Sequence, residues 1–146
     1  MKIYFTALLL FGSLLLACKK ENTITTSDTP AMDMIDTSND SGNLLKYSGN
    51  LSNGPYGSIA GKVKIYENAG RYSLVLDSFM VNNGPDLHVY LSREKQPVNF
   101  IDLGKLRSIS GTQVYVIPGV PDFAAFKFAL IHCQQFDHLF GVAGLQ

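Results

Sequence analysis

The feature that most constrains this chain is a series of short, alternating apolar runs between residues 43 and 146. In Ile59–Tyr66, Lys62 and Lys64 alternate with Val63 and Ile65, as in a strand that buries one face. Further runs of this kind are Arg71–Phe79, Asp86–Ser92, Val98–Leu103, Gln113–Ile117, Phe126–Cys133 and Phe136–Val142. Because Gly, Pro and Asn separate the runs, the pattern predicts an all-β fold: a single antiparallel β-sandwich or barrel-like domain.

Length and charge limit what this domain can be. Residues 43–146 are enough for one compact domain of about 100 residues, with a helical turn expected only at Asp102–Arg107. The chain has 12 Lys and Arg against 12 Asp and Glu. Without a basic excess, nucleic acid is not expected as a partner.

The N-terminus has the pattern of an export signal. After Met1-Lys2, the apolar segment Ile3–Ala17 is shorter than the about 20 residues that span a bilayer. It ends in Leu15-Leu16-Ala17-Cys18, which resembles a bacterial lipobox. The resemblance implies a signal peptide over residues 1–17 and a diacylglyceryl thioether and an N-acyl chain on Cys18, which would anchor the protein in a membrane. The alternative is an uncleaved anchor helix.

Lys19 follows the lipobox where an inner-membrane retention signal would have Asp, so we expect the outer membrane in a cell with two membranes. Which face of the membrane carries the protein stays open. Residues 18–42 are expected to be the lipidated cysteine and a disordered tether, because 14 of the 24 residues from Lys19 to Gly42 are Ser, Thr, Asn or Asp. Met32 and Met34 in this tether are interpreted as incidental rather than as a metal site.

No motif for hydrolysis or nucleotide binding is present. The sequence has no GxSxG, HExxH, CxxC or phosphate-binding loop. The carboxylates of the domain are scattered and next to turns, so they are interpreted as solvated turn caps rather than an acid–base pair: Asp77, Asp86, Asp102, Asp122 and Asp137. A hydrolase is therefore disfavoured.

Cys133 is the cysteine that remains once Cys18 carries lipid, so an intramolecular disulfide is excluded. An exported lone thiol is buried and inert, bound to a group, or reactive. Alternation places Cys133 on one face of its strand with Lys127, and His132 on the other. Because Lys127 marks its face as reachable by water, we expect Cys133 to be partly accessible, with its thiolate available near neutral pH.

The histidines have two interpretations. His132 and His138 both follow the apolar alternation, so each can be an ordinary core or rim side chain. The sharper interpretation makes Cys133, His132 and His138 ligands of haem or copper. Since adjacent residues of a strand point to opposite faces, Cys133 and His132 are not expected to hold the same metal, whereas Cys133 with His138 or His88 is geometrically freer.

Several ordered segments resemble the DM-thirteen domain family. They include residues 82–92 (NNGPDLHVYLS), 101–106 (IDLGKL), 111–118 (GTQVYVIP), and Cys133 followed by residues 140–145 (FGVAGL). The resemblance covers essentially residues 43–146. One difference is His132, which stands where the family commonly has Trp.

The resemblance implies an all-β electron-transfer domain whose cysteine, here Cys133, is a redox thiol or a ligand of a prosthetic group. It would act with a redox partner protein, as an accessory module rather than an enzyme on its own. A second hypothesis is a non-enzymatic binding or adhesion module, in which Cys133 is a small, inert, buried side chain.

Overall fold

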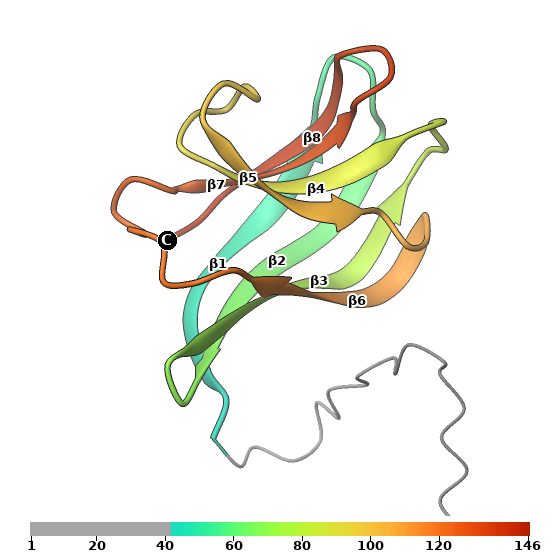
Figure 1. The fold of residues 1–146 in the computed structure, drawn as a ribbon. Coiled ribbons are helices and arrows are strands. Elements are labelled where there is room, and N and C mark those ends of the chain that lie inside the picture. Colours follow the sequence, from blue (N-terminus) through green and yellow to red (C-terminus); the bar gives the residue numbers. More distant parts are fainter. Residues whose placement is uncertain (1–41) are drawn as a thin grey trace, which may run out of the picture. The chain divides into compact units, whose positions relative to one another are not determined.

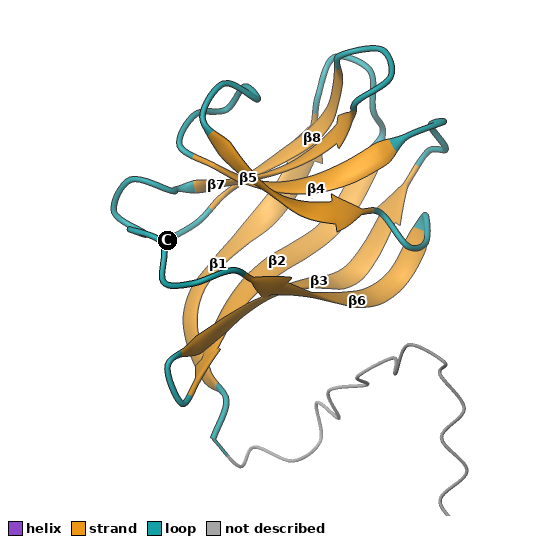
Figure 2. Cartoon of the chain, in the orientation of Figure 1, coloured by secondary structure: helices purple, strands orange, loops and turns teal. Residues whose placement is uncertain are grey.

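The computed structural model describes residues 42–146, which form an all-β domain of eight strands (Figure 2). The strands are β1 (Leu44–Asn53), β2 (Ile59–Asn68), β3 (Arg71–Val81), β4 (Leu87–Ser92), β5 (Phe100–Lys105), β6 (Ser110–Ile117), β7 (Phe128–Cys133) and β8 (His138–Gly144). The predicted fold class is thus confirmed. The predictions for the signal peptide, for Cys18 and for the tether lie outside the described residues, apart from Gly42. No helix in residues 42–146 is long and apolar enough to cross a membrane.

The strands form one antiparallel sheet in the order β5-β4-β7-β8-β1-β2-β3-β6. The sheet curls into a nearly closed, barrel-like arrangement: β1, β2, β3 and β6 form one side, and β5, β4, β7 and β8 the other (Figure 1). Strand β1 belongs to both sides, because its first part pairs with β2 and its last part with β8. The β2–β3 hairpin has positive φ at Ala69 (49°) and Gly70 (77°), as a two-residue type I′ turn requires.

The core fills the space between the two sides. Alternate side chains of the strands point inward and are buried there, among them Val63, Ile65, Leu74, Leu76, Val89, Leu91, Ile131 and Ala143. A second, smaller cluster lies on the outer face of β4, β7 and β8, where Tyr90, Leu130 and Leu139 are buried. In this part of the sheet, side chains are therefore buried on both faces. The buried side chains of the outer face are candidates for a site.

The two ends of the sheet are linked by hydrogen bonds after β5. The backbone N–H of Arg107 donates to the side-chain oxygens of Gln113 and Tyr115, at 3.1 and 3.2 Å. The Tyr115 hydroxyl in turn donates to Gln113 Oε1 at 2.9 Å. These bonds connect β6 to the segment that follows β5. They hold the barrel-like sheet nearly closed.

Two local predictions were wrong. Asp102–Arg107 does not form a helical turn, since Asp102 to Lys105 belong to β5 and pair with β4. Strand β1 was not among the predicted strands, because its sequence, LLKYSGNLSN, has no regular alternation and none of its residues is buried.

Candidate functional site

Cys133 is the last residue of β7 and is completely buried, with 0% exposure. It belongs to the main core, opposite Leu87 of β4 and His138 of β8. The predicted partial accessibility of Cys133 is therefore wrong. Lys127 lies outside β7, which begins at Phe128, so its exposure does not mark a solvent-facing side of the strand. Within residues 42–146, Cys133 is the only cysteine.

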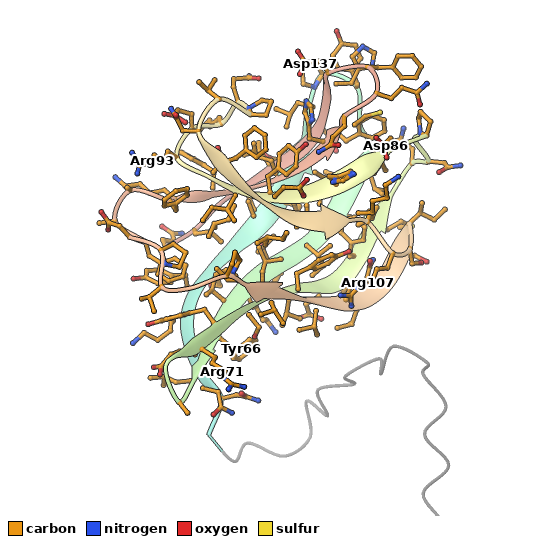
Figure 3. The ribbon with its side chains drawn as sticks, viewed as in Figure 1. Tyr66, Arg71, Asp86, Arg93, Arg107 and Asp137 are labelled. Atoms are coloured by element: carbon orange, nitrogen blue, oxygen red, sulfur yellow. The ribbon has the colours of Figure 1, made fainter. Side chains whose placement is uncertain are left out.

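His132 lies on the outer face of β7, opposite to Cys133, as the alternation predicts. Its neighbour Ile131 joins the main core together with Cys133, whereas His132 contacts Tyr90, whose ring centroid is 5.4 Å away. His132 Nε2 is 3.1 Å from Asp137 Oδ1, in the turn between β7 and β8. Figure 3 shows Asp137 at the tip of this hairpin. His132 and Cys133 therefore cannot bind the same small group.

His138, the third predicted ligand candidate, has an aromatic environment. Its ring stacks on Tyr56 with centroids 3.6 Å apart and planes 2° apart, and Phe136 lies 5.8 Å away. Across the ladder it pairs with Cys133, at the end of the β7–β8 hairpin. Among residues 42–146, no group of three or more His, Cys, Asp or Glu side chains is arranged to hold a metal ion.

The surroundings of Cys133 do not fit a haem. The residue lies in a continuous apolar core with Leu87, Ile131 and Phe140. Because protein cores are close-packed, a porphyrin bonded to this sulfur would have to replace several of these side chains. A copper ion shared by Cys133 and His132 does not fit either, since the two side chains lie on opposite faces of the sheet.

A polar cluster that the sequence did not reveal lies on the outer face of β4, β5 and β7. At its centre is His88, whose Nδ1 is 3.1 and 3.0 Å from the two carboxylate oxygens of Asp102. Asp102 Oδ2 also accepts a hydrogen bond from the side-chain amide of Gln134 at 3.0 Å. Asp86 Oδ1 lies 2.8 Å from Lys105 Nζ and 3.5 Å from His88 Nε2. We call this group, with His132 and Asp137, the histidine cluster.

The carboxylates of this cluster were interpreted as turn caps, which is correct for Asp102 only in part. Its Oδ1 accepts the backbone N–H of Gly104 at 2.8 Å, a cap-like bond, while the same carboxylate binds His88. Asp122, by contrast, only caps, accepting the N–H of Ala124 at 3.0 Å. The signal that could have identified His88 is its alternation with Leu87 and Val89, which places an imidazole on the face opposite the core.

Aromatic rings connect the histidine cluster to the surface. Tyr90 is 2% exposed and stacks on Phe100 with ring centroids 4.1 Å apart, while Phe100 is 40% exposed. Tyr90 also lies 6.2 Å from the His88 ring. Beside His132 is a cavity of about 250 Å³ whose lining includes Pro97, Val98 and Leu139. The outer face of β4 and β7 thus has two buried histidines, a buried tyrosine and an opening to solvent.

The protonation of these groups follows from their burial. Burial lowers the pKa of His132, although the Asp137 carboxylate acts in the opposite direction. Burial also raises the pKa of Tyr90. The hydrogen bond from Lys105 lowers the pKa of Asp86. At neutral pH, His132 is therefore a neutral imidazole, and Asp86 a carboxylate.

Comparison with known proteins assigns this domain. The family described as Electron transfer DM13 matches residues 50–145, which include all of β2 to β8 and Cys133. No curated protein matches the chain, and no solved structure does. Because the family match covers most of the chain and almost all of the described domain, the protein belongs to the Electron transfer DM13 family.

Proposed function

We propose that this protein is a lipid-anchored electron-transfer domain that uses Cys133 as a redox thiol and acts with a redox partner protein. The observation that carries the proposal is the match to an electron-transfer family over residues 50–145, a range that contains Cys133. Since no second cysteine is present in residues 42–146, the partner of this thiol must lie outside the domain.

A lone thiol transfers electrons by forming a bond with another sulfur. The Cys133 thiol first loses its proton to solvent, and the thiolate then attacks a disulfide of the partner. A new disulfide forms between Cys133 and one partner sulfur, the partner's own disulfide breaks, and the second partner sulfur leaves as a thiolate. A thiol that attacks the mixed disulfide at the partner sulfur returns Cys133 to its reduced form.

This reaction requires the sulfur to be exposed for a short time. Cys133 is buried, but the next four residues, from Gln134 to Asp137, are all exposed and form the turn of the hairpin. The Cys133–His138 pair is the last of the β7–β8 ladder. Because strand ends beside an exposed turn open more readily than whole domains unfold, opening of this tip is the route by which a partner reaches the sulfur.

Mass spectrometry of the intact chain tests the proposal. A Cys18→Ser variant, in which Cys133 is the remaining cysteine, is incubated with glutathione disulfide under native conditions. We expect a mixed disulfide on Cys133 that a reductant removes, and no adduct when Cys133 is also changed to Ala. A chain that reacts when denatured but never in the native state contradicts the proposal.

The alternative function is a binding or adhesion module with an inert Cys133. The observation that favours it is the complete burial of this residue among apolar side chains, where a cysteine behaves as a small hydrophobic residue. In that case the glutathione experiment gives no native adduct, and a Cys133→Ala variant retains the binding function.

The location proposed for the domain is the cell envelope. It rests on the lipobox-like residues before Cys18 and on Lys19 in place of the inner-membrane signal. The acyl chains would insert in the outer membrane of a cell with two membranes, and residues 19–42 would connect them to the domain. A tethered redox domain reacts with partners near the same membrane surface.

A further inference from the structure

Gln134, the residue that follows Cys133, is bound to two other segments of the sheet although it is exposed. Its backbone N–H donates to the carbonyl oxygen of Asp86, just before β4, at 3.0 Å. Its side-chain amide donates to Asp102 Oδ2 of β5 at 3.0 Å. Because β4 lies between β7 and β5 in the sheet, the side-chain bond links the end of β7 to a strand that is not its neighbour.

The acceptor of this side-chain bond is itself held in place. Asp102 Oδ1 accepts the backbone N–H of Gly104 at 2.8 Å, and His88 Nδ1 lies 3.0 Å from Oδ2. The segment after β5 is held against β4 by a bond from the Leu106 N–H to the Leu87 carbonyl oxygen, at 2.7 Å. Since hydrogen bonds to carboxylates are stronger than those between neutral groups, Asp102 is a fixed and strong attachment point for the hairpin tip.

The two bonds of Gln134 oppose the motion that would uncover Cys133. The Leu87–Cys133 pair is the last of the β4–β7 ladder at this end, and the backbone bond of Gln134 follows directly after it. Cys133 belongs to the main core, whereas the side chain of Gln134 binds Asp102 on the outer face. Moving Cys133 away from Leu87 therefore also breaks the bonds of Gln134 to Asp86 and Asp102.

We propose that Gln134 is a latch: its bonds to Asp86 and Asp102 keep the tip of the β7–β8 hairpin closed over Cys133, and the thiol reacts only after they break. This regulation rests on the proposed redox role of Cys133, and it sets how often the thiol is exposed. Losing one intramolecular hydrogen bond changes an opening equilibrium by about 2- to 10-fold. The latch therefore keeps Cys133 from reacting with small oxidants at the rate of an exposed cysteine.

The other arm of the hairpin tip is held by contacts that do not involve Gln134. The His138 ring stacks on Tyr56 with centroids 3.6 Å apart, and the Tyr56 N–H donates to the carbonyl oxygen of Leu139 at 3.3 Å. These contacts attach the start of β8 to the loop between β1 and β2. Release of the latch is therefore expected to move the end of β7 and to leave the start of β8 in place.

Amide hydrogen exchange of the full chain, carrying Cys18→Ser, tests the latch without thiol chemistry. The reporter is the N–H of residue 134, which is hydrogen-bonded in the closed tip, and the reference is the N–H of Tyr56. After correction for intrinsic rates, Gln134→Ala should raise reporter exchange about 2- to 10-fold and leave the reference unchanged. Gln134→Glu should raise it further, because it places a second carboxylate against Asp102. The rate at which iodoacetamide labels Cys133 should rise in parallel with reporter exchange.

The matched controls are Gln135→Ala and Gln135→Glu, which change the next exposed residue of the turn and should leave both rates unchanged. Because both positions are exposed, all four variants are expected to fold. The latch is wrong if neither Gln134 variant changes reporter exchange, if exchange rises without faster labelling, or if Gln135→Glu acts as strongly as Gln134→Glu. Exchange and labelling that rise together in a chain without a native glutathione adduct would support the latch and contradict the redox role of Cys133.

Discussion

The Cys133 residue is packed between Leu87 and His138 of the two neighbouring strands, although an exposed turn begins at the next residue. The thiol is therefore shielded from solvent, but it lies one residue away from an exposed turn. A thiol deep in the middle of β7 would need the whole domain to unfold before it reacted. At the end of the strand, opening of the hairpin tip, which separates Cys133 from both Leu87 and His138, would uncover it without unfolding the rest of the domain.

Burial of His132 makes the stability of the domain depend on pH. The folded-state pKa of this residue is below its ordinary value of 6.5, so between these two values the unfolded chain binds more protons than the folded one. Stability is therefore complete above about pH 7 and decreases as the pH falls through 6.5.

Urea unfolding at a series of pH values, with a chelator present, measures this effect. We expect His132→Gln to have a weaker loss of stability between about pH 7 and pH 5 than the unchanged chain. The lowered pKa values of Asp77 and Asp86 act at more acidic pH and remain in both proteins. The same pH dependence in the His132→Gln variant would contradict the role given to His132.

At the residue scale, alternation correctly predicted that His132 and Cys133 lie on opposite faces. It could not predict that Cys133 is buried, because burial depends on which face the other side of the sheet covers. The pairing of His88 with Asp102 was equally hidden. It depends on the register of β4 against β5, which shifts between His88 and Tyr90, and no local pattern reports such a shift.

Strand β1 shows the limit of local patterns for whole elements. It is the strand that joins the two sides of the sheet, yet its burial pattern contains no buried residue. Its place is fixed by backbone pairing with β2 and β8, together with Tyr47 and Leu51, which pack half-buried against the core. The other seven strands alternate more clearly and were predicted with boundaries close to those observed.

Close packing of backbone in the loop between β1 and β2 gives a test at the element scale. A Cβ atom on Gly57 would lie 2.0 Å from the carbonyl oxygen of Phe140 in β8, so a side chain cannot be accommodated without moving the backbone. We expect Gly57→Ala to lower the free energy of unfolding by about 3 kcal/mol.

The matched control for this prediction is Gly70→Ala. Gly70 has a φ of +77° but nothing lies within 4 Å of an added Cβ, so this variant carries backbone strain alone, about 1 kcal/mol. Both values come from urea unfolding curves. Equal costs for the two substitutions would show that β8 does not approach Gly57 as closely as the structure has it.

On the scale of the whole molecule, the family match and the fold agree on one all-β domain of the Electron transfer DM13 family, and the proposed anchor adds its location. Changing Cys18 to Ser removes the residue that would carry lipid. We expect the variant to leave the membrane fraction, because a single apolar segment of this length does not hold a protein as stably as several acyl chains. Immunodetection in membrane and soluble fractions measures this, with Lys19→Ala as the control that stays on the membrane. Full membrane retention of Cys18→Ser would contradict lipid anchoring.

The most direct test of the redox-thiol proposal is the rate at which an alkylating reagent labels Cys133 in the Cys18→Ser chain, measured across low concentrations of urea. Reaction through local opening of the β7–β8 tip exposes little surface, so its rate should depend weakly on urea. Reaction through global unfolding exposes the whole core and should follow the full urea dependence of the folding equilibrium. We predict weak dependence in the native range. Labelling that follows the global urea dependence down to zero denaturant would contradict a redox role for Cys133 and would identify it as an inert core residue.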